Sequence, residues 1–192
     1  MLVDSCYFKA SFEDRKWPWQ TGYVSWKIAQ QEQGGHSHEE LKFLHAVLKS
    51  WVLNASLIRK QAVLSHPILS EALDKGYDVC ASSSGRDGGV RFKFAKEVLK
   101  HEDRWDVLDT TDDMEKAYVM LGFFIEEDGK DYDFAGVSGF KVSFIRQNPD
   151  KWYCSEICDA AKKLAGLWME FYRSHPSASY WIQKFLTALK IK

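Results

Sequence analysis

The sequence lacks long apolar runs, a secretory leader and an excess of basic charge. No run approaches the ~20 apolar residues that cross a bilayer, so we expect no membrane span. The start, MLVDSCYFKASFEDRKW, has no basic segment followed by an apolar one, which predicts a cytoplasmic protein without a signal peptide. With 26 Lys and Arg against 27 Asp and Glu, the chain offers no general basic surface for nucleic acid.

Cysteines and cofactor motifs are also scarce. Four cysteines in 192 residues do not make a disulfide framework, so reduced thiols are expected. The stretch GRDGGVRFK lacks both the Walker lysine-serine pair and the GxGxxG spacing, and is interpreted as a tight turn with solvated charges. The acidic stretch EEDGKDYD does not match a calcium loop. We therefore predict no cofactor.

The residues that are present suit one packed domain over residues 1–192. Hydrophobic residues make up 45% and aromatic residues 15% of the chain, which supports a core and argues against disorder. Strands and helices interleave without regular crossover helices, which favours an α+β fold with a small, largely antiparallel sheet. Strands are expected at 5–12, 36–43, 77–84, 90–94 and 105–110. Helices are expected at 22–33, at 110–129, from Cys154, and in 175–190.

Residues 44–75 differ from the rest of the chain. They are rich in leucine and alanine at helical spacing, with breaks near Asn54 and at Ser65-His66-Pro67. We interpret them as two or three short helices, inserted in the domain. Such an insertion would cover a cleft or bind a protein partner.

Cys154, in WYCSEICDAA, is the first candidate for chemistry. It stands at the expected start of a helix, where exposed backbone N–H groups and the helix dipole favour a thiolate. A thiolate is a nucleophile, but most cysteines are inert and pack as small apolar residues. From position alone both interpretations stay open, and Cys158, one turn further on, is expected to pack in the core.

A base for this thiol has to come from the six histidines. His38 is best placed, because its expected strand follows a helix and a glycine pair and would hold the imidazole rigidly. Its neighbours on one face of that strand are Glu40 and Lys42. His66 is the rival, although Pro67 makes it a natural helix boundary. A solvated histidine in HSHEE is the alternative without function.

Zinc is a further possibility that we considered. Cys154 and Cys158 share a helical face, and His36 and His38 would complete a four-ligand set. The spacing fits no common zinc motif, so no metal site is predicted.

Five stretches, in chain order, carry a resemblance to a known family. They read GYVSWKIAQQEQGGHSHEELKF, CASSSGRDGGVRFK, RWDVL, YDFAGVSGF and KWYCSEICDAA, and cover most of residues 20–161. Their order resembles the circularly permuted papain-like cysteine hydrolases of the broad NlpC-type group, especially small members encoded by phages and bacteria. The most specific part is YDFAGVSGF followed by WYCSE. The histidine precedes the cysteine, as in the permuted order.

The resemblance implies a fold and a set of roles. Cys154 would be the nucleophile, His38 the base, and backbone N–H groups at the helix start the oxyanion site. The family's third polar residue lies on the next strand and orients the imidazole. Here that position falls near Ser82, where many relatives carry an acid or a histidine. Asp78, on the same expected face, is the substitute.

The resemblance also implies an activity. We expect a thiol hydrolase that cleaves an amide through an acyl-enzyme, with a peptide, isopeptide or peptidoglycan-stem bond as substrate. Members of the group also include lipid acyl hydrolases and acyltransferases. The alternative of a different class is a papain-like binding module that has lost turnover. For a phage-encoded member, the expected cytoplasm is that of the host.

Overall fold

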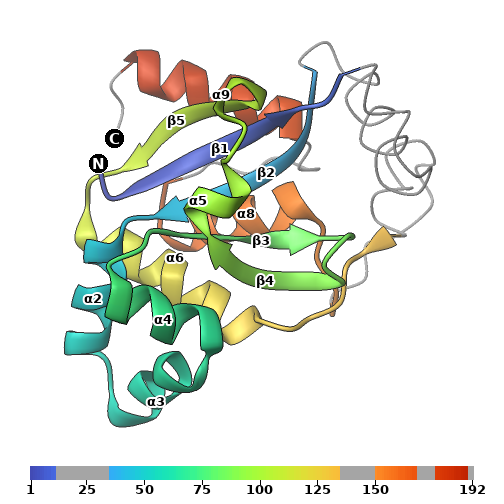
Figure 1. Ribbon diagram of the computed structural model, residues 1–192. Coiled ribbons are helices and arrows are strands. Elements are labelled where there is room, and N and C mark those ends of the chain that lie inside the picture. Colours follow the sequence, from blue (N-terminus) through green and yellow to red (C-terminus); the bar gives the residue numbers. More distant parts are fainter. Residues whose placement is uncertain (12–34, 135–149, 168–175, 190–192) are drawn as a thin grey trace.

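The computed structural model describes residues 1–11, 35–134, 150–167 and 176–189. Its centre is a five-stranded antiparallel sheet in the order β4-β3-β2-β1-β5 (Figure 1). The strands are β1 (Val3–Lys9), β2 (His36–Phe43), β3 (Val79–Ser84), β4 (Gly89–Phe94) and β5 (Trp105–Thr111). With the helices around this sheet, the expected α+β class and antiparallel sheet are confirmed.

Seven α-helices lie in the part of the chain that the structure describes. They are α2 (His45–Asn54), α3 (Leu57–Ser65), α4 (Pro67–Lys75), α5 (Ala95–Val98), α6 (Met114–Glu127), α8 (Cys154–Leu164) and α9 (Pro176–Leu189), with a short 3-10 turn, η2 (Glu102–Arg104). The predicted strands and helices are found with shifted ends. The helix expected at 22–33 and most of YDFAGVSGF lie outside the described residues.

Local capping explains where several helices begin and end. The Asp113 carboxylate accepts hydrogen bonds from the backbone N–H groups of Glu115 (2.9 Å) and Lys116 (3.3 Å), at the start of α6. Gly76, with φ +74°, ends α4 in the left-handed conformation that glycine adopts without strain. These signals stand in the sequence itself, which is why α4 and α6 were predictable.

Helices α6, α8 and α9 pack on the sheet and on one another, and α2–α4 form a lobe at one end (Figure 1). The predicted breaks in 44–75 are confirmed, because three helices lie there. Val47, Leu48 and Trp51 of α2 and Leu69 and Ala72 of α4 are buried in the main core. The lobe therefore supplies part of the core that it shares with the sheet.

Candidate active site

Cys154 is the first residue of α8, and its approach is held by the backbone before it. Trp152 pairs with Tyr132 in a parallel bridge, and its carbonyl accepts hydrogen bonds from the Asp133 N–H (3.0 Å) and the Ser83 hydroxyl (2.7 Å). Tyr153 is extended and buried, so the chain turns directly into the helix at Cys154. The thiol is 4% exposed. The sequence prediction that a helix starts at this cysteine is confirmed.

His38 meets Cys154 from strand β2. The Cys154 side chain is close enough to the imidazole to raise the pKa of His38 through its charge and through hydrogen bonding. His38 Nε2 lies 2.6 Å from Glu40 Oε1, which leaves Nδ1 as the nitrogen available to the sulfur. Glu40 is two residues along the same strand, so both side chains leave the sheet on one face. The structure therefore brings together the predicted nucleophile and the predicted base.

Glu40 is held in turn by Arg91 of β4. The guanidinium donates to both carboxylate oxygens, at 2.7 Å from Nη1 to Oε2 and 2.5 Å from Nη2 to Oε1. The Glu40 side chain is 1% exposed, and a buried carboxylate is stable only when it is paired and hydrogen bonded. The Arg91 guanidinium and the His38 imidazole together supply the hydrogen bonds that the buried Glu40 carboxylate needs.

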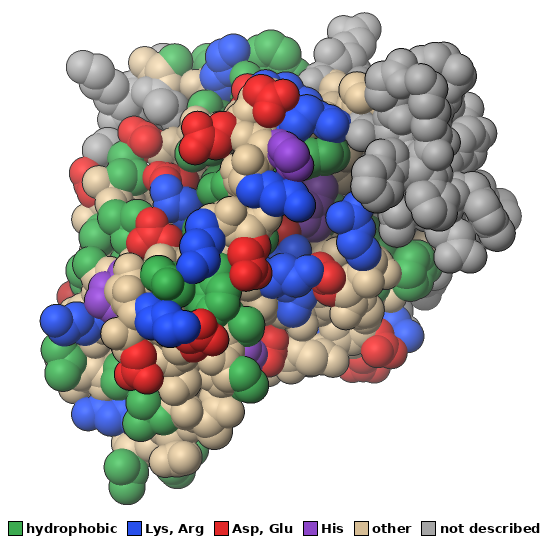
Figure 2. All heavy atoms as spheres, viewed as in Figure 1, with side chains coloured by type: hydrophobic (Ala, Val, Ile, Leu, Met, Phe, Trp, Pro, Cys, Tyr) green, Lys and Arg blue, Asp and Glu red, His purple; other side chains and the backbone are tan. Residues whose placement is uncertain are grey.

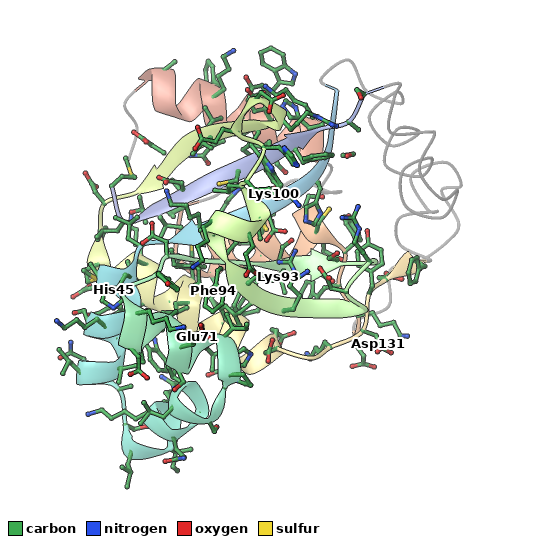
Figure 3. All side chains as sticks on the ribbon, viewed as in Figure 1. His45, Glu71, Lys93, Phe94, Lys100 and Asp131 are labelled. Carbon is green, nitrogen blue, oxygen red and sulfur yellow. The ribbon has the colours of Figure 1, made fainter. Side chains whose placement is uncertain are left out.

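The turn GRDGG supports Arg91 from behind. Asp87 accepts from Arg91 Nε at 3.0 Å and from Lys93 Nζ at 2.5 Å. Lys93 is labelled on β4 in Figure 3. Gly89 lets the turn approach a second segment, since a Cβ there would stand 1.9 Å from the carbonyl oxygen of Lys130. The predicted tight turn is confirmed, but its charges are not merely solvated: Asp87 and Arg91 belong to a chain of contacts that ends at His38.

This arrangement shifts the pKa values of the two central groups in opposite directions. Burial alone would lower the pKa of His38, but negative charge on Cys154 and Glu40 and hydrogen bonds to both raise it to about 9. Burial alone would raise the pKa of Glu40, but Arg91 and then His38 lower it to about 2. Both shifts favour the charged forms, an imidazolium at His38 beside a carboxylate at Glu40.

The other residues predicted for the site lie in different contacts. The Ser82 hydroxyl donates to the carbonyl oxygen of Glu39 at 2.6 Å, where the pairing of β2 with β3 has ended. Asp78 accepts from the backbone N–H of His45 at 2.8 Å, at the start of α2. Their hydrogen bonds thus go to backbone groups, and the position beside the imidazole is occupied by Glu40.

His66, the rival base, has a structural task at the start of α4. Its Nδ1 accepts from the Leu69 N–H at 3.2 Å, and its Nε2 lies 3.2 Å from Asp128 Oδ2. This agrees with the helix boundary that Pro67 indicated. The polar contacts of His66 are therefore with α4 and the end of α6, and its ring packs edge-on against Phe92 of β4.

The two cysteines and two histidines considered for zinc do not lie together as one set of four ligands. In the described parts of the chain, no group of three or more His, Cys, Asp or Glu side chains has the geometry to hold a metal ion. Cys158 is fully buried, its thiol donates to the Glu39 carbonyl at 3.7 Å, and burial raises its pKa well above the usual value. Nε2 of His36 binds Asp106 at 2.8 Å.

Beneath the sheet lies a second ionic cluster. Lys162 of α8 is fully buried and donates to Glu39 Oε1 at 2.5 Å and to the Tyr7 hydroxyl at 3.3 Å. Asp159, one turn earlier, lies 3.6 Å from Lys162 Nζ and accepts from the Ser179 hydroxyl of α9 at 2.9 Å. Because Glu39 alternates with His38 and Glu40, it points to the helix side of β2 and anchors α8 there.

Tyr132 borders the nucleophile from the segment after α6. Burial and then negative charge on Cys154 raise its pKa well above the usual value, so the phenol keeps its proton. The side chain is half-buried, and its ring packs edge-on against Phe134 with centroids 4.8 Å apart.

Sequence reasoning missed Glu40 and Arg91 as partners of the imidazole. The signal for Glu40 was present, since the i, i+2 spacing in HSHEELKF put it on the face of His38. Arg91 stood in RDGGVR, but nothing in the sequence indicates that β4 lies near enough to β2 for a guanidinium to reach across β3.

In comparisons with known proteins, the chain matches no family model, no curated protein and no solved structure.

Proposed function

We propose that the protein is a thiol hydrolase that cleaves an amide bond through an acyl-enzyme on Cys154. One observation carries the proposal: a continuous line of contacts runs from Cys154 through His38 and Glu40 to Arg91. A sulfur at a helix start, an imidazole, and a buried carboxylate that orients it form the arrangement that nucleophilic catalysis needs. The proposal includes the permuted papain-like fold that the motif order resembles.

The proposed reaction begins from the ion pair. The sulfur of Cys154 attacks the carbonyl carbon, a C–S bond forms, and the π electrons move to the oxygen. Backbone N–H groups at the start of α8 would bind that oxyanion. The intermediate then collapses, the C–N bond breaks, and the proton of the His38 imidazolium passes to the leaving amine.

Water completes the cycle. Neutral His38 takes a proton from a water molecule, whose oxygen attacks the thioester carbonyl. The C–S bond breaks, the acid leaves, and the thiolate-imidazolium pair returns. Glu40 keeps the imidazole in one orientation through both steps and, held by Arg91, does not take up the proton itself. A peptide, isopeptide or peptidoglycan-stem amide could be cleaved by these reaction steps, and so could an acyl ester.

The test is site-resolved alkylation with iodoacetamide, read by mass spectrometry. In the native protein at pH 7 we expect Cys154 to react roughly 10²-fold faster than Cys6 and Cys80, which are buried thiols whose pKa burial raises. His38→Ala should abolish the difference. Glu40→Gln should slow Cys154 by about tenfold or more, since the imidazole loses its charged partner.

Ser82→Ala and Asp78→Ala are the matched controls. Each removes a hydrogen bond to a backbone group, so each should cost about 1 kcal/mol of stability and leave Cys154 reactivity within about twofold. Equal reactivity of all four cysteines in the native chain would exclude the hydrolase and favour a papain-like binding module. If Ser82→Ala slows the alkylation of Cys154 and Glu40→Gln does not, Ser82 on β3 orients the imidazole instead of Glu40.

A further inference from the structure

Helix α3 is the least buried regular element of the lobe. Of its nine residues only Val63 is buried. Leu57 is 82% and Ile58 84% exposed, the highest values among the exposed large hydrophobics of the described residues, and Leu53 just before them is 68% exposed. A short helix is held mainly by packing of its apolar face. Most of the apolar surface of α3 instead faces outward.

The charged residues near these hydrophobic side chains in the sequence are all basic. Between Glu40 and Glu71 the sequence contains no Asp or Glu, although the chain has 27 of them. The same stretch contains Lys49, Arg59 and Lys60 of the lobe, while its fourth basic residue, Lys42, lies on β2 and pairs with Asp4. Across space, Glu126 of α6 meets Arg59 at 3.0 Å, but both side chains are more than 60% exposed, so the pair is weak.

The shape of this surface decides which partner fits it. The α2–α4 lobe protrudes from the sheet, and hydrophobic side chains project from its tip (Figures 1 and 2). A stable protein interface needs about 20–30 residues a side, far more than one short helix offers. A bilayer needs only a few apolar side chains that enter the headgroup boundary and basic residues that attract anionic lipid.

We propose that the tip formed by Leu53, Leu57, Ile58 and Leu64, with the basic residues Lys49, Arg59 and Lys60, docks the protein on an anionic membrane surface. The aliphatic side chains enter the lipid headgroup region and the cations meet lipid phosphates. The described helices include none that is long and apolar enough to span a membrane, so this contact is peripheral. The tip is separate from Cys154, and the docking does not depend on the proposed hydrolase activity.

The experiment uses the full chain and sedimentation with vesicles of phosphatidylcholine containing about one third phosphatidylglycerol. The double variant Leu57→Ser, Ile58→Ser should bind at least tenfold more weakly than the native chain, since two aliphatic side chains are lost from the contact. Lys60→Gln should weaken binding about fivefold. Leu164→Ser, at a 61% exposed leucine of α8, is the control and should bind like the native chain.

Three results would overturn the proposal. The first is no binding of the native chain to the anionic vesicles, or equal binding to pure phosphatidylcholine. The second is unchanged binding in the double variant. The third is a native chain that self-associates in light scattering without lipid and becomes monomeric in the double variant, which would make the tip an interface between protein copies. Alkylation of Cys154 should be the same in all these variants.

Discussion

His38 lies between two groups that attract its proton, and this decides how the site responds to pH. The charge on Cys154 and on Glu40 outweighs the effect of burial and sets its pKa at about 9, above the usual 6.5. A histidine whose pKa is raised by folding stabilises the native state while it is protonated. That contribution is present in full below pH ~6.5 and is lost as pH rises through about 9.

We therefore expect the urea midpoint of the native protein to fall between pH ~6.5 and 9 by an amount that His38→Ala removes. Titration of His38 by NMR should give a pKa of about 9. Glu40→Gln and Cys154→Ser should each lower it, because each takes away one of the two charges. A pKa near 6.5 in the native chain would mean that the ion pair does not form.

The sequence placed Glu40 on the same strand face as His38 but did not identify it as the residue beside the imidazole. Alternation along HSHEELKF put Glu40 beside His38, but the resemblance to permuted hydrolases turned attention to Ser82 and Asp78 on the following strand. Those two bind backbone groups. The acid on the same strand is favoured here because Arg91 is positioned to neutralise it, and an unpaired carboxylate at that depth would not stay charged.

Between elements, the Lys162–Glu39 pair joins α8 to β2. It lies on the opposite face of β2 from His38, and we expect it to fix where the helix that starts at Cys154 rests on the strand. A buried ion pair adds little net stability, but loss of one partner leaves the other charge buried alone. We expect this ion pair to contribute mainly by fixing the position of α8 along β2.

Lys162→Met should lower the free energy of unfolding by about 3–5 kcal/mol, because Glu39 stays behind unpaired. The double variant Glu39→Leu, Lys162→Met should regain much of that loss, yet keep a slower alkylation of Cys154 than the native chain. Lys163→Met, at the exposed neighbouring lysine, is the control and should change neither. Urea unfolding and alkylation rates measure the two effects.

Native alkylation in the double variant would contradict this positioning role. Should the double variant alkylate Cys154 at the native rate, the ion pair has no part in positioning the nucleophile. Packing of Ile157, Cys158 and Ala161 against the sheet would then be sufficient to place α8.

At the scale of the whole molecule, the lobe of α2–α4 is joined to the core. The Trp51 ring is 6% exposed and lies beside Gly122 of α6, where a Cβ would come within 3.6 Å of its indole nitrogen. Because of this shared core, we expect the lobe and the sheet to unfold together. Residues 44–75 are then an insertion in the sense of their position in the sequence. They are not expected to fold independently of the sheet.

Trp51→Ala should destabilise the protein by about 3–5 kcal/mol, since it opens a cavity between α2 and α6. Leu53→Ala, on the same helix but 68% exposed, should cost little. Far-UV circular dichroism and fluorescence of the remaining tryptophans should show one coincident urea transition. Two separate transitions in the Trp51→Ala variant would identify the lobe as an independent unit.

The sequence by itself determined the features that depend on a few neighbouring residues. Alternation gave β2, the Asp113 cap gave the start of α6, and WYCSE gave a helix that begins at Cys154. The tertiary structure decided which side chains meet. Arg91 reaches Glu40 across 51 positions of sequence, and Lys162 reaches Glu39 across 123. Such contacts follow from strand order and from the register of α8 on the sheet, which the burial of the whole core selects.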